Sequence, residues 1–221
     1  MISIDKQQKL LLDLSKELQK PITAYAVGGT AMMFLGLKES TLDVDLVFED
    51  TESKDLLMNA AQAMGYQKMD AVKIYGNKKN KPDMLTRGDE RLDLFVRDVI
   101  DFTFSKNMQQ RAADTHQFGD KLTLKIANIH DLILMKCATS RLKDKDDVRS
   151  IILSRNIDWN IIIKEAQNQV ILGRPEAIFN LGEFLEALQQ DLKEKIPDTV
   201  INQLWELVKK QAEEKTQIHK K

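Results

Sequence analysis

The hydrophobic pattern of this chain changes its period near residue 126, and this change constrains the fold more than any other feature. Before it, short runs rich in β-forming residues are interleaved with stretches whose apolar residues recur every three or four positions. After it, only the second spacing remains, in segments 130–139, 147–153, 159–169, 177–192 and 199–215. The sequence therefore predicts an α+β fold: a mixed β-sheet with flanking helices in a domain of residues 1–126, followed by an all-helical domain of residues 127–221.

Individual elements of the first part can be placed by their spacing and by the residues that flank them. We expect strands at 22–27, 43–48, 91–96 and 121–126, and helices at 5–18, 31–37 and 53–64. Ser53 is the expected N-cap of the last of these helices, and Gly65 follows its end. Residues 73–75 and 84–86 are expected to form a hairpin around the polar loop 76–83.

Composition excludes several classes of protein. The 221 residues include 33 Lys and Arg and 34 Asp and Glu, so the chain is not a polycation that coats nucleic acid. A single cysteine, Cys137, excludes internal disulfides and favours a reducing compartment. The first residues lack the apolar core of a signal peptide. We therefore expect a cytoplasmic protein without a membrane partner.

The longest uncharged run, Pro21–Leu37, contains the sequence Val27-Gly28-Gly29-Thr30. At 17 residues the run is marginal for a membrane span, and the glycines interrupt it, so we interpret it as strand, turn and helix. Glycines allow close backbone approach to a ligand, and N–H groups at a helix start favour phosphate. Taken alone, the pair is more often a structural turn, and no P-loop or dinucleotide fingerprint accompanies it.

Two acids alternate with apolar residues in Thr41-Leu42-Asp43-Val44-Asp45-Leu46. Residues two apart in a strand share a face, so Asp43 and Asp45 project together, in the pattern of a divalent-metal site. The alternative is a strand with one solvated face. Val47 argues against it because it shares the face of the aspartates, and buried like charges need a counter-ion.

A third acid, Asp93, lies in the apolar run Arg91-Leu92-Asp93-Leu94-Phe95-Val96. If this strand neighbours 43–48, Asp93 completes a three-carboxylate metal site. The alternatives are an exposed edge position or an ion pair between Arg91 and Asp93.

Together these motifs resemble the nucleotidyltransferase superfamily related to DNA polymerase β, whose signature is a glycine pair opening a helix, followed by Asp-hydrophobic-Asp on a strand. Downstream, Lys136 precedes an Arg-x-Lys-Asp-x-x-Asp-hydrophobic run at 141–148, which is similar to the abortive-infection, type IV toxin nucleotidyltransferases and their uncharacterised relatives. Thr41 fits their Ser/Thr position, whereas Glu39 replaces their Arg. The resemblance implies a nucleotidyltransferase-fold sheet over the first domain.

The resemblance also implies roles for single residues. Asp43, Asp45 and Asp93 would be catalytic and would bind two Mg²⁺ ions, or Mn²⁺. The remaining implied nucleotide-binding residues are Gly28, Gly29, Thr30, Thr41, Lys136 and Arg141, with Lys143, Asp144 and Asp147 in support. For Lys136, the alternative to a nucleotide contact is that its side chain extends along an apolar surface with the ammonium in water. For Lys143 and Asp147, the alternative is an ordinary ion pair between residues four apart on a helix. Residues 121–155 hold eight Lys and Arg and four Asp, which suits a phosphate-rich ligand or a solvated helix face.

The leading hypothesis is a metal-dependent nucleotidyltransferase that moves a nucleoside monophosphate from a nucleoside triphosphate to an acceptor hydroxyl and releases pyrophosphate. The acceptor stays open among RNA (tRNA in a toxin-like enzyme with a cognate antitoxin), a protein side chain and an antibiotic-type small molecule. The alternative is a non-catalytic nucleotide-binding or protein-interaction module on the same fold. Neither the histidines nor Cys137 have the spacing of a zinc site.

Overall fold

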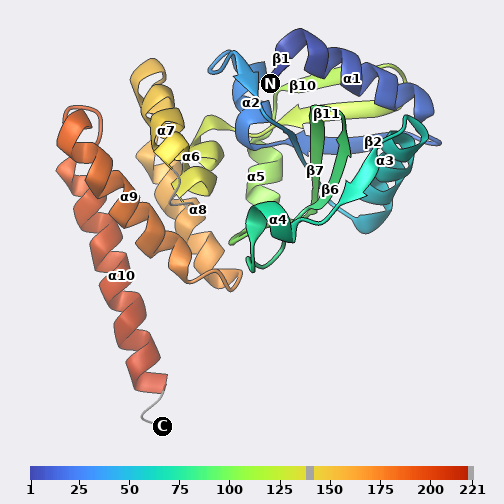
Figure 1. The fold of residues 1–221 in the computed structure, drawn as a ribbon. Coiled ribbons are helices and arrows are strands. Elements are labelled where there is room, and N and C mark those ends of the chain that lie inside the picture. The colour runs from blue at the N-terminus through green and yellow to red at the C-terminus, as the bar shows by residue number, and fades with distance from the viewer. Residues whose placement is uncertain (138–141, 219–221) are drawn as a thin grey trace. The chain divides into compact units, whose positions relative to one another are not determined.

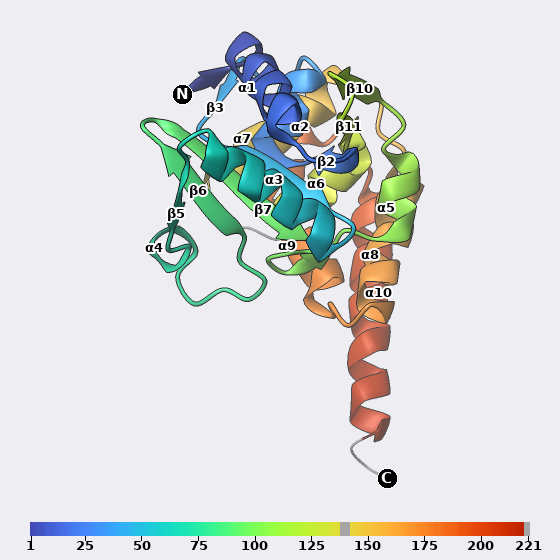
Figure 2. The ribbon, with the colours of Figure 1, turned by 90° about the vertical axis from the view of Figure 1, so that its right-hand side faces the viewer.

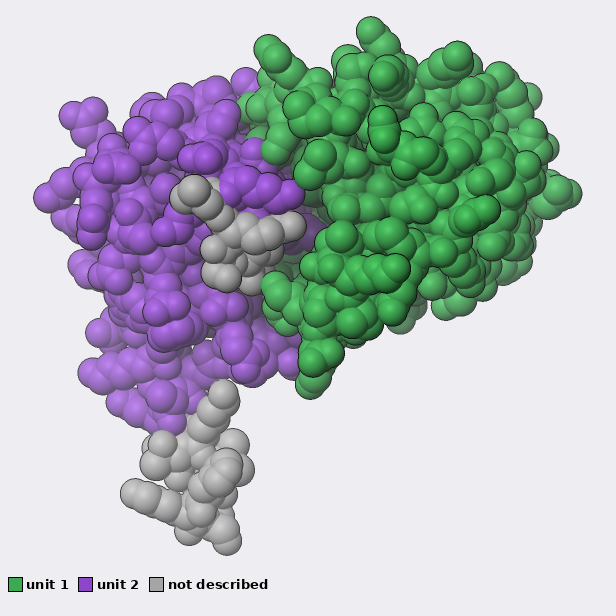
Figure 3. Space-filling view, viewed as in Figure 1, with its two compact units in different colours: residues 1–128 green, residues 129–221 purple. Residues whose placement is uncertain are grey.

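The computed structural model describes residues 1–137 and 142–218, with side chains described over 1–137 and 143–213. The chain forms two compact units, residues 1–128 and residues 129–221 (Figure 3). The first unit contains every described strand and the second contains only helices within its described part (Figure 1). The expected α+β class, with a mixed sheet followed by a helical part, is therefore confirmed.

The first unit is built on one large mixed sheet with the strand order β10-β11-β2-β4-β7-β6-β5. Its seven main strands are β2 (Ile22–Ala26), β4 (Val44–Phe48), β5 (Gln67–Met69), β6 (Asp83–Arg87), β7 (Glu90–Val96), β10 (Thr115–Phe118) and β11 (Leu122–Ile126). The pairs β11/β2 and β4/β7 are parallel, and the other neighbours are antiparallel. Two short strands, β8 (Asp98–Val99) and β9 (Phe102–Thr103), extend β7, while β1 (Ile2–Ser3) and β3 (Ser40–Thr41) pair separately.

Helices α1 (Ile4–Glu17) and α3 (Thr51–Ala63) lie together on one face of this sheet (Figure 2). The apolar stripe of α1 at Leu10, Leu11 and Leu14 is buried, as its spacing of three and four residues requires. The other helices of this unit are the short α2 (Gly28–Phe34), α4 (Val72–Tyr75) and α5 (Lys106–Arg111). Apolar side chains of α1 and α3, such as Leu14 and Leu57, are fully buried and form part of the core of this unit.

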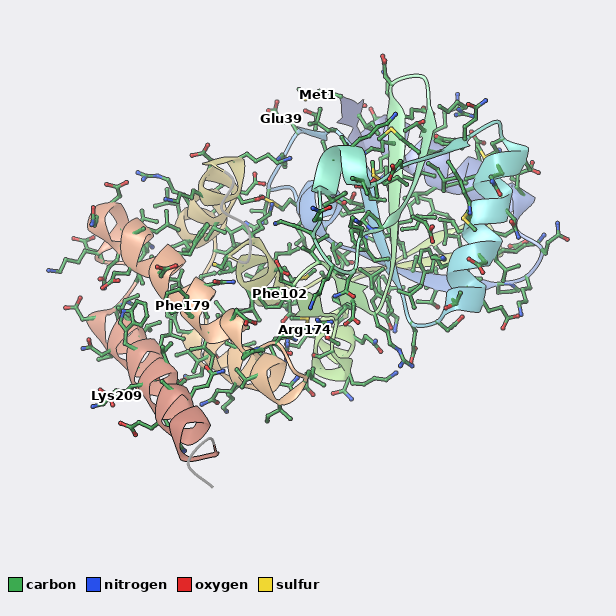
Figure 4. All side chains as sticks on the ribbon, turned by 60° about the horizontal axis from the view of Figure 1, so that its bottom comes forward. Met1, Glu39, Phe102, Arg174, Phe179 and Lys209 are labelled. Atoms are coloured by element: carbon green, nitrogen blue, oxygen red, sulfur yellow. The ribbon has the colours of Figure 1, made fainter. Side chains whose placement is uncertain are left out.

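The second unit contains α6 (Ile129–Cys137), α7 (Leu142–Ser154), α8 (Trp159–Ile171), α9 (Glu176–Leu192) and α10 (Asp198–Ile218). Helix α9 packs against α6, α8 and α10. Phe179 on α9, labelled in Figure 4, meets the Trp205 ring of α10 edge to face, and the same indole lies beside Gly182. Among the described residues, no helix has the length and apolar character needed to cross a membrane.

Three local expectations were wrong. Residues 73–75 belong to the helical turn α4 instead of a strand, because the Asp70 carboxylate accepts the Val72 N–H at 2.9 Å and Gly76 ends the turn at a φ of +57°. Strand β6 pairs instead with β5 and β7. The N-cap of α3 is Asp50, whose carboxylate accepts the Ser53 N–H, so Ser53 lies inside the first turn.

The start of the helix after the glycine pair was also misplaced. Helix α2 begins at Gly28 and not at Ala31, so both glycines lie in its first turn. This shift matters for the site because it brings the glycine backbone directly against the strand that bears the aspartates.

Candidate active site

Asp43, Asp45 and Asp93 converge at one place in the first unit. Strands β4 and β7 are parallel neighbours, and Asp45 lies opposite Asp93 in their register. Asp43 directly precedes β4. One carboxylate oxygen from each of the three residues lies within 4.8 Å of the others. The structure therefore brings together the three acids that the sequence singled out.

The surroundings of these carboxylates are mostly buried. Asp93 is fully buried, Asp43 is 8% exposed and Asp45 is half-buried. The apolar residues of β4 are buried on both of its faces, Val47 included. Buried like charges repel each other and are poorly solvated, so this arrangement requires positive charge nearby.

Arg91 supplies positive charge from the same strand as Asp93. Its guanidinium forms ion pairs with Asp43 and, at 3.0 Å from Nε to Oδ1, with Asp93. The second contact does not have hydrogen-bond geometry, so it is an electrostatic contact only. The Arg91–Asp93 pair that the sequence offered as an alternative is thus present together with the carboxylate cluster.

Tyr75 is a neighbour of the cluster that sequence reasoning missed. Its hydroxyl donates to Asp93 Oδ2 at 2.7 Å from the helical turn α4, 18 residues earlier in the chain. On the other side of the cluster, the Thr41 hydroxyl donates to Asp43 Oδ1 at 3.3 Å. No periodic or motif signal in residues 70–76 points to Tyr75, because its contact depends on how α4 folds over the sheet.

The glycine pair packs directly against this cluster. Gly28 has a φ of +56°, and a Cβ there would lie 2.5 Å from Asp45 Oδ2. A Cβ at Gly29 would overlap the Thr41 hydroxyl. The absence of side chains at both positions is therefore a steric requirement of the site.

Thr30 holds the aspartate strand from inside the protein. Its buried hydroxyl accepts the Asp45 N–H at 2.9 Å and lies 3.5 Å from the Asp43 carbonyl oxygen, to which it donates. These contacts occupy the hydroxyl with backbone groups on both sides of Val44. The Thr30 hydroxyl thus bonds to the backbone of the aspartate strand, and the contact with phosphate that the resemblance implied for it stays a prediction.

The other implied residues lie in the second unit. Lys136 on α6 is buried, and its Nζ donates to Asp144 Oδ1 at 3.1 Å and to Asp147 Oδ2 at 2.6 Å. Both acids therefore hold the ammonium group of Lys136. Lys143 is exposed on α7. Arg141 lies outside the described residues.

The three carboxylates have the chemistry of a site for a divalent cation. Carboxylate oxygens are the ligands that Mg²⁺ and Mn²⁺ prefer, and two oxygens on one Mg²⁺ are at most about 4.2 Å apart, twice the metal–oxygen distance. The observed limit of 4.8 Å needs only a small side-chain adjustment to reach this value. The residues present therefore fit a bound divalent metal.

Comparison with known proteins agrees with this geometry. The sequence profile of the family described as "Nucleotidyltransferase of unknown function (DUF6036)" matches residues 1–178, which include the whole carboxylate cluster. The chain belongs to this nucleotidyltransferase family. The expected superfamily is thereby confirmed, while the toxin-like subgroup stays a prediction.

Searches of other known proteins add little to this assignment. No curated protein matches the sequence of this nucleotidyltransferase. One matching solved structure, ANT(2″)-Ia in complex with adenylyl-2″-tobramycin, is 17% identical, with a TM-score of 0.44, and the match covers 82% of this chain and 98% of that one. So distant a likeness carries no conclusion about the activity of the present chain.

Proposed function

We propose that this nucleotidyltransferase is metal-dependent and transfers a nucleoside monophosphate from a nucleoside triphosphate to an acceptor hydroxyl, with release of pyrophosphate. The observation that carries the proposal is the convergence of Asp43, Asp45 and Asp93 beside the glycine pair. In-line transfer of this kind depends on positioning and on neutralising phosphate charge, and this site offers groups for both.

In this proposal the carboxylates hold two Mg²⁺ ions, or Mn²⁺. Asp43 and Asp45 would bind the ions that accompany the triphosphate, and Asp93 would hold the ion nearest the acceptor hydroxyl. When bound, the metal supplies charge neutralisation for the phosphates and lowers the pKa of the acceptor hydroxyl. Arg91 must release at least part of its contact with Asp43 and Asp93 when a cation binds there.

The glycine pair is the proposed seat of the triphosphate. The first N–H groups of a helix have no partner within the helix, and the Val27 N-cap provides no side-chain bond to them. Gly28 and Gly29 would therefore present backbone N–H groups to the phosphates, while Thr30 and Thr41 hold the aspartates in place. Contact of Lys136 and Arg141 with the triphosphate remains a prediction.

The acceptor hydroxyl completes the proposal. RNA is the acceptor in its toxin-like form, which would include a small antitoxin partner, and a protein or small-molecule hydroxyl would use the same chemistry. Retention of all three acids argues for an active enzyme over a non-catalytic module on this fold.

The test combines transfer and binding. The protein is incubated with Mg²⁺, total RNA and each of the nucleoside triphosphates labelled on the α-phosphate. We expect label on an acceptor with the wild type, none with Asp45→Asn, and unchanged transfer with Asp101→Asn, which removes an exposed acid of the same unit. Absence of both transfer and metal-dependent nucleotide binding in the wild type would overturn the proposal.

A further inference from the structure

Residues 71–82, between β5 and β6, carry four lysines and no acid, in a chain whose net charge is −1. We call this stretch the basic segment, and it includes the helical turn α4. Lys73, Lys78 and Lys79 are exposed, and within residues 1–137 and 142–218 none of the three forms an ion pair. Their positive charge is therefore available to a ligand.

The basic segment is held in place by polar contacts. Lys81 Nζ donates to the Gly76 carbonyl oxygen at 3.0 Å. Asn80 and Ile100 exchange two hydrogen bonds, from the Asn80 side-chain amide at 2.8 Å and from the Ile100 N–H at 3.2 Å. Figure 2 shows α4 and the loop after it extending beyond β5 and β6. The segment thus presents its lysines from a defined position.

Tyr75 connects this segment to the carboxylate cluster through its 2.7 Å hydrogen bond to Asp93. Lys73 and Lys78 lie two and three residues from Tyr75, so their Cα atoms are within about 7 and 11 Å of the Tyr75 Cα. The basic segment is therefore attached, through Tyr75, to the carboxylate that faces the acceptor hydroxyl in the proposed function.

Sheet order separates the basic segment from the proposed triphosphate seat. The glycine pair follows β2, on one side of β4, whereas the segment joins β5 to β6, on the far side of β7. Accordingly, Gly28 packs on Asp45 and Tyr75 bonds to Asp93. The lysines are thus placed on the acceptor side of the cluster.

We propose that the basic segment binds the phosphate backbone of a single-stranded nucleic-acid acceptor, and that Tyr75 is a positioning residue that anchors the segment beside Asp93. Lysines provide contacts to phosphates, and the half-exposed Val72 and Ile74 offer apolar surface against which bases can pack. The binding surface is inferred from the exposed lysines and from the contacts that hold the segment, whereas its role in the reaction rests on the proposed function.

The test measures anisotropy of labelled single-stranded RNA, and of DNA of the same sequence, against salt concentration. The segment variant is Lys73→Gln/Lys78→Gln/Lys79→Gln. The matched control, Lys193→Gln/Lys209→Gln/Lys210→Gln, removes the same charge from exposed positions of the helical unit, such as Lys209 on α10 (Figure 4). We expect the segment variant alone to bind about tenfold more weakly, with a salt slope shallower by about 2, because each lost phosphate contact on a single strand removes about 0.7.

Three results would overturn the proposed binding surface. The segment variant and the control variant could lose the same affinity for the single strand, or the segment variant could keep its full affinity. The segment variant could also lose affinity for the nucleoside triphosphate and not for the strand. Stronger binding of RNA than of DNA would show that the ribose 2′-hydroxyl takes part in recognition. Equal binding would show that the segment recognises the phosphate backbone alone. Both outcomes support the proposed binding surface.

A second variant tests the anchor. Tyr75→Phe keeps the lysines and removes the hydroxyl, so we expect an unchanged Kd for RNA and a kcat about tenfold or more below the wild type. An unchanged kcat, or a parallel rise in the Kd for RNA, would contradict the positioning role. If the wild type binds RNA through the segment and transfers no nucleotide, the proposed function fails while the surface stands. If the segment variant retains full RNA binding and still transfers nucleotide, the binding surface fails while the proposed function stands.

Discussion

At the scale of single residues, Arg91 occupies the place where a cation is most needed. Its guanidinium lies between Asp43 and Asp93, with only 19% of its side chain exposed. Since the same two carboxylates are proposed metal ligands, Arg91 and a divalent ion neutralise the same charges. The first unit should therefore be stabilised by the Arg91 guanidinium or, in its absence, by a bound divalent ion.

Arg91→Met is expected to destabilise the metal-free protein by about 3–5 kcal/mol, because it leaves buried carboxylates without a partner. Mn²⁺ should then raise the unfolding temperature of the variant more than that of the wild type. Calorimetry with and without Mn²⁺ measures both effects. A variant as stable as the wild type in the absence of metal would show that Arg91 does not neutralise the cluster.

At the scale of elements, the turn from β2 into α2 sets the geometry of the site. Gly28 and Gly36 provide a matched pair, since both have a positive φ, at +56° and +67°. An added Cβ would meet the Asp45 carboxylate at Gly28, whereas at Gly36 it would meet nothing within 4 Å. Backbone strain is thus common to both positions, whereas the clash with Asp45 is not.

Gly28→Ala should therefore abolish Mn²⁺ binding, measured by electron paramagnetic resonance, because Asp45 must move. Gly36→Ala should retain the affinity and lose only about 1 kcal/mol of stability to strain. Equal metal affinity in the two variants would contradict the close packing of Gly28 on the carboxylate.

The β6–β7 hairpin has its own pH-sensitive contact. The Tyr66 hydroxyl donates to Glu90 Oε2 at 2.6 Å, and the Arg87 guanidinium lies 4.6 Å from the centre of the Tyr66 ring. Burial, followed by the hydrogen bond to Glu90, raises the pKa of Tyr66 above its ordinary value of 10.0. The folded state therefore retains this proton at a pH where the unfolded chain loses it.

The stabilising contribution of this hydroxyl is fully present below pH 10 and is lost as the pH rises towards the pKa of the folded state. At pH 7, Tyr66→Phe should cost about 1.5–3 kcal/mol, the range for a hydrogen bond to a charged group. The difference between wild type and variant should shrink above pH 10. Urea unfolding at both pH values measures it, and a constant difference would contradict the role of the proton.

The elements that the sequence predicted well are those whose pattern is local. Strands β4 and β7 stand out as short apolar runs, and the apolar stripe of α1 repeats every three and four residues. Helical turn α4 was misread because Val72, Ile74 and Tyr75 are β-forming residues. A composition rule does not weigh the Asp70 carboxylate that accepts the Val72 N–H at the start of the turn, or the glycine that ends it. Strand β10 was not foreseen, since it depends on pairing with β11.

The candidate site divides in the same way. The three aspartates could be selected from spacing, because Asp45 and Asp93 lie in apolar strands, Asp43 directly precedes one, and a charge in such a run needs a reason. Their partners could not: the Tyr75 contact spans 18 residues, and the Thr30 hydroxyl bonds to backbone groups 13 and 15 residues away. Such contacts follow from the folded chain and leave no periodic signal.

At the scale of the whole molecule, the two units can be observed separately by chemistry. Cys137, the single cysteine, belongs to the helical unit and is 4% exposed. Burial, together with the negative charge of Asp144, raises the pKa of its thiol well above the ordinary value. Its reaction with a thiol reagent therefore reports on opening of that unit.

We expect native Cys137 to react at pH 8 at least about 100-fold more slowly than in urea, because the thiolate is the reactive form and is suppressed by burial. A disulfide reagent with a coloured product measures the rate. Immediate reaction of the folded protein would contradict the buried position of the thiol.

The division into two units also sorts the chromophores of the chain. Its three tyrosines, Tyr25, Tyr66 and Tyr75, lie in the unit of residues 1–128, and its two tryptophans, Trp159 and Trp205, lie in the helical unit. Light that excites indole alone will therefore report only on the helical unit. Under light that also excites phenol, any energy that passes from tyrosine to tryptophan crosses from one unit to the other. The yield of this transfer therefore measures the separation of the two units in solution.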